Sequence, residues 1–145
     1  MRLPTQFAVA MIALVPNTGC TENAVQREHD KLQGTWQVLR QEFDGNDTNT
    51  AELRFVITPG KIVARNKNGE HTITYKLDPE AQPKTIELTF NPDTKRYTLA
   101  GIYLLDGDTL RICASDMGKP RPTEFTSPKG SRLTLYVLRR VKPGA

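Results

Sequence analysis

Short strand-like segments, each ended by a turn signal, follow one another along nearly the whole chain. Asn68-Gly69 and Asp106-Gly107 are typical of tight hairpins, because the residues at their centres tolerate positive φ. No stretch between neighbouring segments is long enough for a crossover helix. Sequential hairpins of this kind either leave two exposed strand edges or close into a barrel.

Alternation of apolar and polar residues predicts eight strands within a domain at residues 34–141. The first should end at a turn cluster at residues 44–47. Eight closed strands enclose an interior just wide enough for side chains or one small ligand. We therefore predict an all-β, eight-stranded antiparallel up-and-down barrel, with strands near residues 35–43, 53–57, 61–65, 71–77, 85–90, 97–105, 109–113 and 132–139.

The two ends of this domain carry an informative pair of residues. The one Trp of the chain, Trp36, enters the first strand after a glycine, and Arg139-Arg140 closes the last strand. Small lipocalin-like barrels seal their closed end in a similar way, with a guanidinium stacked on the indole face. Parity favours Arg139 as the partner, because it shares a strand face with Leu133, Leu135 and Val137.

Residues 1–20 have the pattern of an export leader. Arg2 precedes an apolar run at residues 7–15, which is too short to span a bilayer as a helix. The small residues before Cys20 resemble a lipobox, so we expect lipid attachment at Cys20, although Asn17 replaces the usual Leu. Ordinary signal-peptide cleavage and an uncleaved leader are the alternatives, and each of the three routes leads to the cell envelope or periplasm.

Residues 21–33 are good helix formers, and Val25, His29 and Leu32 fall at helical spacing. They predict a short helix or linker that leans on the barrel, while residues 142–145 form a tail. Cys113 lies in an apolar strand, which favours a buried small hydrophobe over a reactive thiol.

The charge balance argues against a polyanionic partner. The 145 residues carry 20 basic and 16 acidic side chains, a net charge of +4, and the two signs alternate along the chain. This pattern is typical of solvated strand faces, so we expect no nucleic-acid binding and contact with a membrane only through an N-terminal lipid.

Several ordered sequence blocks resemble a paralogous family of small exported proteins best known from planctomycete bacteria. The resemblance covers about residues 31–141. It implies an exported domain with a lipocalin-like strand pattern, and it implies no particular activity. The blocks are residues 32–38, 75–79, 83–88, 101–113 and 121–125.

Aromatic side chains on the strands are candidates to line a pocket, although such residues more often pack in a core. Arg121, in a Pro-rich loop, has two interpretations. It is either part of a lid that meets an anionic ligand or, as we favour, part of a rigid loop in which Phe125 fills the core. The pocket candidates are Tyr75, Tyr97, Tyr103, Arg121, Phe125 and Tyr136, with Phe55 and Phe90 beside them.

The sequence holds no motif that indicates catalysis, a metal or a cofactor. His29 and His71 are the two histidines, and their positions do not give the three ligands of a zinc site. We expect a monomeric module that binds a small apolar or amphipathic molecule. The alternative is an envelope interaction module with a filled barrel, and an interior void of about 300 Å³ or more would favour the first.

Overall fold

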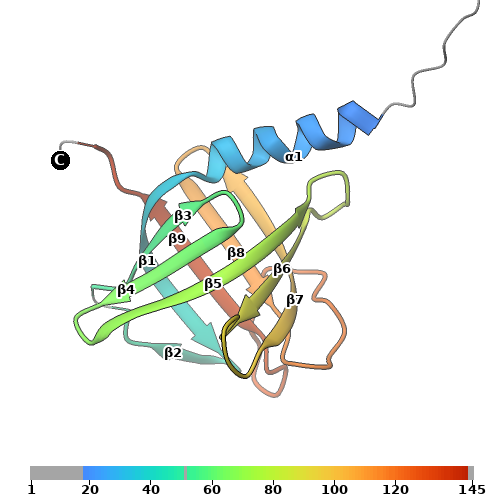
Figure 1. Ribbon diagram of the computed structural model, residues 1–145. Coiled ribbons are helices and arrows are strands. Elements are labelled where there is room, and N and C mark those ends of the chain that lie inside the picture. The colour runs from blue at the N-terminus through green and yellow to red at the C-terminus, as the bar shows by residue number, and fades with distance from the viewer. Residues whose placement is uncertain (1–17, 51, 144–145) are drawn as a thin grey trace, which may run out of the picture.

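The computed structural model describes residues 18–50 and 52–143, and it confirms an all-β barrel with a short N-terminal helix (Figure 1). The leader is expected at residues 1–20, of which residues 1–17 lie outside the described part. The elements are α1 (Thr18–Leu32), β1 (Gly34–Phe43), β2 (Asn46–Thr48), β3 (Arg54–Thr58), β4 (Lys61–Asn66), β5 (Gly69–Asp78), β6 (Thr85–Phe90), β7 (Tyr97–Asp106), β8 (Thr109–Ala114) and β9 (Thr134–Arg140).

Pairing of the first strand with the last closes the sheet. β1 pairs antiparallel with β3, each strand from β3 to β8 pairs antiparallel with the next one in the chain, and β9 returns to pair with β1 from Trp36↔Arg140 to Phe43↔Thr134. A bulge between Val38 and Arg40 interrupts this last ladder, and such bulges bend a strand and increase its twist. The eight strands that form the closed barrel, which we call its staves, are therefore β1 and β3–β9.

The short strand β2 is an addition to the predicted barrel. It lies in the segment where the sequence indicates only a turn, and it pairs with the last three residues of β1. The hairpin uses Asp44 and Gly45, which both have positive φ. β2 extends the sheet beyond the closed ring and contributes no buried side chain.

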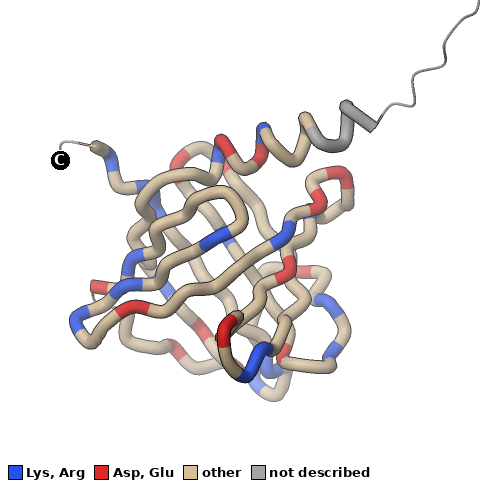
Figure 2. Tube along the Cα trace, in the orientation of Figure 1, with Lys and Arg blue, Asp and Glu red and all other residues tan. Residues whose placement is uncertain are grey.

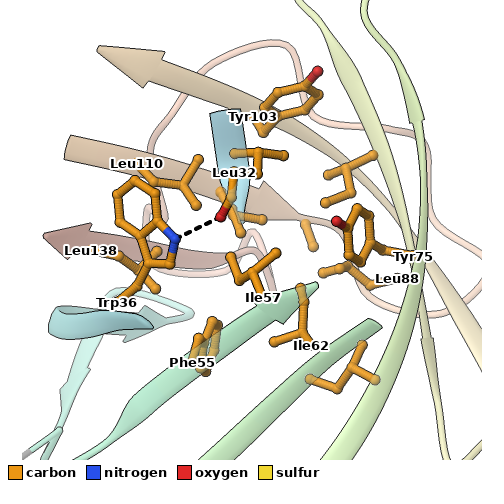
Figure 3. Close-up of a cluster of buried hydrophobic side chains, with 14 of the residues drawn as sticks. Leu32, Trp36, Phe55, Ile57, Ile62, Tyr75, Leu88, Tyr103, Leu110 and Leu138 are labelled. Atoms are coloured by element: carbon orange, nitrogen blue, oxygen red, sulfur yellow. Dashed lines mark hydrogen bonds between the residues drawn. The ribbon is translucent and has the colours of Figure 1, made fainter. Parts of the chain in front are cut away.

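Side chains fill the interior of the barrel. Most inward positions of the barrel are apolar, and the cavity that remains among the core side chains is only about 10 Å³, which is too small for more than one water. This is the tight packing expected for a protein core. Among the largest of these buried side chains are Trp36, Ile57, Ile62, Tyr103, Leu110, Ile112 and Leu138 (Figure 3).

The C-terminal end of α1 closes one end of the barrel. Leu32, the last residue of α1, is buried in the core, and its carbonyl accepts a 2.8 Å hydrogen bond from Trp36 Nε1 (Figure 3). The Arg140 guanidinium lies 4.3 Å from the centre of the Trp36 ring and donates to the carbonyls of Gln33 and Lys31. Gly34 (φ +136°) makes room for this side chain, since a Cβ there would lie 3.2 Å from Arg140 Nη1. One indole and one guanidinium thus join the helix to both closing strands.

The partner of Trp36 is Arg140 and not Arg139, which corrects the prediction from parity. Leu138 and Arg140 point inward, whereas Arg139 is exposed on the outer face of β9. Parity was misleading because that outer face is also apolar. Leu133, Leu135 and Val137 pack there with Ile102 and Cys113 in a second cluster outside the barrel.

The long segment at residues 115–133 covers this second cluster. Phe125 packs against it, and the Cys113 thiol donates to the Thr126 carbonyl at 3.4 Å. The Cys113 side chain is fully buried, and burial raises its pKa above the ordinary value. Cys113 is therefore a small buried residue of the outer apolar cluster, as its place in an apolar strand predicts.

Replacing Trp36 should destabilise the protein severely. Trp36→Ala removes a fully buried indole together with its hydrogen bond to Leu32 and its contact with Arg140, so we expect a loss of about 3–5 kcal/mol. That is a large part of the roughly 5–15 kcal/mol typical of a domain. A thermal melt should show a midpoint lowered by roughly 10 °C or more. The matched control is Arg139→Ala, at an exposed position. A Trp36→Ala midpoint within a few degrees of wild type would contradict this role.

Candidate functional site

The six predicted pocket residues fall into three separate places. Tyr75 and Tyr103 lie at the closed end beneath α1, Arg121 and Phe125 lie outside the barrel, and Tyr97 and Tyr136 lie at the opposite end. The sequence pattern could not separate these groups, because several strands are apolar on both faces. Each place has its own chemistry.

At the closed end, Tyr103 belongs to a buried polar network around Glu28. The Tyr103 hydroxyl donates to Glu28 Oε2 at 2.9 Å, and Lys84 Nζ donates to Oε1 at 2.9 Å. Burial of the carboxylate opposes its ionisation, but these two hydrogen bonds and the charges of Lys84 and Lys31 outweigh that effect and lower the pKa of Glu28. Glu28 therefore links α1 to β7 through Tyr103 and to the β5–β6 connection through Lys84.

Tyr75 makes a second attachment between the helix and the barrel. Its hydroxyl donates to the Thr58 carbonyl at 2.9 Å and lies 3.0 Å from His29 Nδ1. Since the hydroxyl hydrogen points to Thr58, His29 Nδ1 is the donor to the tyrosine oxygen. Burial raises the pKa of Tyr75. Tyr75 and Tyr103 thus hold the helix in place, and both are enclosed in the core rather than open to a ligand.

Arg121 is anchored on the outer wall of the barrel. Its Nη1 donates to the Gly101 carbonyl at 2.6 Å and to the Ile86 carbonyl at 3.2 Å, and its Nη2 lies 3.8 Å from a Glu87 carboxylate oxygen. These contacts correspond to the rigid-loop interpretation. Phe125 packs on the outer cluster rather than inside the barrel.

A pocket of about 320 Å³ opens at the end of the barrel opposite α1. The helix is bonded to Tyr75 on β5 through His29 and to Lys84 in the β5–β6 connection through Glu28. The pocket includes residues next to the β4–β5 and β6–β7 turns, which lie at the other end of the barrel (Figure 1). We call it the mouth pocket. Its lining residues are Gln41, Leu53, Phe55, Ala64, His71, Thr72, Ile73, Phe90, Asn91, Tyr97 and Tyr136.

Two aromatic pairs form opposite walls of the mouth pocket. Phe55 and Tyr136, on β3 and β9, lie with ring centroids 5.4 Å apart and planes tilted by 57°. Phe90 and Tyr97, on β6 and β7, stack at 5.1 Å with planes 4° apart. In an eight-stave ring the β6–β7 pair is diametrically opposite β1, which β3 and β9 flank. The pocket therefore has aromatic surface on two facing sides.

The polar groups of the mouth pocket are mostly uncharged. The described lining includes no Asp, Glu, Lys or Arg. Over the rest of the barrel, basic and acidic residues are interspersed (Figure 2). The half-buried Tyr136 side chain has no hydrogen-bond partner for its hydroxyl among residues 18–50 and 52–143. Burial, with a smaller contribution from Tyr97, raises the pKa of Tyr136 to about 12, so this hydroxyl stays protonated at neutral pH.

No group of three or more His, Cys, Asp and Glu residues in the described part of the chain is arranged to hold a metal ion. Within the same residues, no helix has the length and apolar character needed to cross a membrane. No family model, curated protein or solved structure matches the chain. The site must therefore be interpreted from its own geometry.

The Glu28 network should make stability depend on pH in the acid range. A carboxylate whose pKa is lowered by folding stabilises the folded state above its ordinary pKa of 4.5, and this contribution is lost as the pH falls through the lower folded value. Urea unfolding from pH 3 to 7 should show wild type more stable than Glu28→Gln at neutral pH, with a difference that shrinks below about pH 4.5. Glu80→Gln, at an exposed turn position, is the control. A difference independent of pH would show that the ionised carboxylate contributes nothing.

Proposed function

We propose that this protein is a non-enzymatic binding module that holds a small apolar or amphipathic molecule in its mouth pocket. The observation that carries the proposal is a pocket of about 320 Å³ with facing aromatic walls. This volume lies at the lower end of the range typical of small-molecule sites, which are mostly apolar with a few polar groups. The ligand would sit at the mouth and not inside the barrel, whose interior is filled.

A filled interior also favours a second function, an interaction module that contacts other envelope proteins through its loops or outer face. The exposed apolar side chains Leu39, Leu104 and Met117 lie outside the core and are available for such contacts. Scattered exposed apolar residues are normal on monomeric proteins. The mouth pocket is the more specific feature, so we place the binding module first.

Blocking the mouth pocket should abolish ligand binding without unfolding the barrel. Ala64 faces the pocket on β4, and its neighbour Val63 faces outward. Native mass spectrometry of protein from its own cells should show a bound small molecule in wild type and in Val63→Phe, and none in Ala64→Phe. Thermal melts of both variants check that they are folded. A wild-type protein without any bound molecule, or an adduct that Ala64→Phe retains, would contradict the proposal.

We also propose that the domain is exported and anchored through Cys20. The supporting features are Arg2, the apolar run at residues 7–15 and the small residues before Cys20. Residues 1–17 and the side chain of Cys20 lie outside the described part of the structure. Intact-mass measurement of protein from its native membrane should show a chain that begins at Cys20 with added acyl mass, and Cys20→Ser should lack that mass. A wild-type chain without acyl mass would remove the anchor.

A further inference from the structure

The depth of the mouth pocket restricts the shape of its ligand. Below the pocket, the interior cavity measures only about 10 Å³ and is walled by Ile57, Ile62, Tyr75 and Leu110 among others. An extended acyl chain needs a tunnel that leads into the barrel, and this interior is packed solid. The available space of about 320 Å³ lies at the mouth and does not continue into the interior, which suits a short, flat molecule.

The aromatic walls of the pocket favour a ligand that contains an aromatic ring. Aromatic rings interact favourably by offset stacking or edge-to-face contact, at centroid separations of about 4.5–7 Å. The stacked pair Phe90 and Tyr97 presents an ordered aromatic surface, and the tilted pair Phe55 and Tyr136 faces it from the opposite wall. A planar aromatic molecule bound in this pocket would meet aromatic side chains from four strands, β3, β6, β7 and β9.

The polar groups of the pocket select against a charged ligand. A buried charge is costly unless an opposite charge or several hydrogen bonds compensate for it, and the described lining offers no acidic side chain and no Lys or Arg. The aromatic walls carry two hydroxyls, those of Tyr97 and Tyr136, and neither has a hydrogen-bond partner within the described residues. The Tyr136 side chain is half-buried, and burial raises its pKa. We therefore assign the contact with the ligand to the Tyr136 hydroxyl. As a protonated phenol it is a hydrogen-bond donor.

We propose that the mouth pocket recognises an uncharged planar aromatic molecule, with the Tyr136 hydroxyl donating a hydrogen bond to an acceptor on its ring or substituent. This inference rests on the proposed function, because it specifies the ligand class for the same pocket. In this proposal the ligand ring contacts Phe55, Phe90, Tyr97 and Tyr136, and the ligand's acceptor atom is bonded by the Tyr136 hydroxyl alone.

A pair of nearly isosteric probes tests the assignment. Quinoline and naphthalene have the same shape, but only quinoline carries an acceptor nitrogen, and it is neutral at pH 7.5. Titrations followed by ¹H–¹⁵N amide shifts of the full chain should perturb residues around the mouth with both probes. Decanoate, which carries both a chain and a charge, and 2-naphthoate, which carries a charge on the same fused ring, should bind at least tenfold more weakly than quinoline.

The variant Tyr136→Phe removes the hydroxyl and keeps the aromatic wall. We expect its affinity for quinoline to fall about three- to tenfold, which corresponds to one net hydrogen bond, and its affinity for naphthalene to stay unchanged. Val63→Phe, on the outer face of β4, is the control and should bind both probes like wild type. Tyr97→Phe tests the other hydroxyl of the pocket and should show no selective loss of quinoline. Since the lost hydroxyl has no protein partner in the described structure, the melting midpoint of Tyr136→Phe should stay within a few degrees of wild type.

Each other outcome overturns a defined part of the proposal. If Tyr136→Phe binds quinoline as wild type does, or if Tyr97→Phe shows the selective loss instead, the hydroxyl assignment is wrong. If decanoate or 2-naphthoate binds as tightly as quinoline, the restriction to uncharged rings is wrong while ligand binding at the mouth stands. If none of the four probes perturbs the mouth amides, both this inference and the proposed ring-lined site fail.

Discussion

The pairing of β1 with β9 is the constraint on which the rest of the structure depends. Once these strands pair, eight staves enclose a space that side chains must fill, and one end must be covered. Trp36 and Arg140 lie opposite each other in this closing ladder, and both reach the last turn of α1. The same two residues that join the ends of the sheet therefore also position the helix that covers it.

The two ends of the barrel differ in how completely their polar groups are hydrogen-bonded. At the helix end, every polar group described in detail has a partner, including Glu28 with Tyr103 and Lys84, and Tyr75 with Thr58. Satisfied buried networks of this kind make a structure rigid. At the mouth, the Tyr136 hydroxyl faces a pocket without a partner among the described residues. This contrast is a physical reason to look for a ligand at the mouth.

The alternation of residues and the turn signals were sufficient to predict the closed barrel and the eight staves, because each local signal agrees with the global fold. The prediction that Arg139 rather than Arg140 is the partner of Trp36 was wrong. The outer face of β9 is apolar because it packs beneath the loop at residues 115–133, so in the sequence it cannot be told from the inner face. The same ambiguity between the inside and the outside of the barrel put Phe125 and Arg121 among the predicted pocket residues. Glu28 was missed because a carboxylate in a polar helix gives no sign of burial until Lys84 and Tyr103, which are distant in sequence, are brought to it. The mouth pocket depends on which aromatic side chains lie at which end, and period-two patterns do not encode that.

A barrel packed solid has a consequence for how such a protein can diversify. In a barrel whose ligand occupies the interior, a change of ligand requires a change of core, and each step risks the fold. Here core residues such as Trp36 and Ile62 do not line the mouth pocket, while Phe55 and Ile73 belong to both the core and the lining. Substitutions at the exposed lining positions, such as His71 and Thr72, and in the adjoining turns can alter recognition at little cost in stability. One scaffold can in this way carry different specificities at its mouth over the same interior.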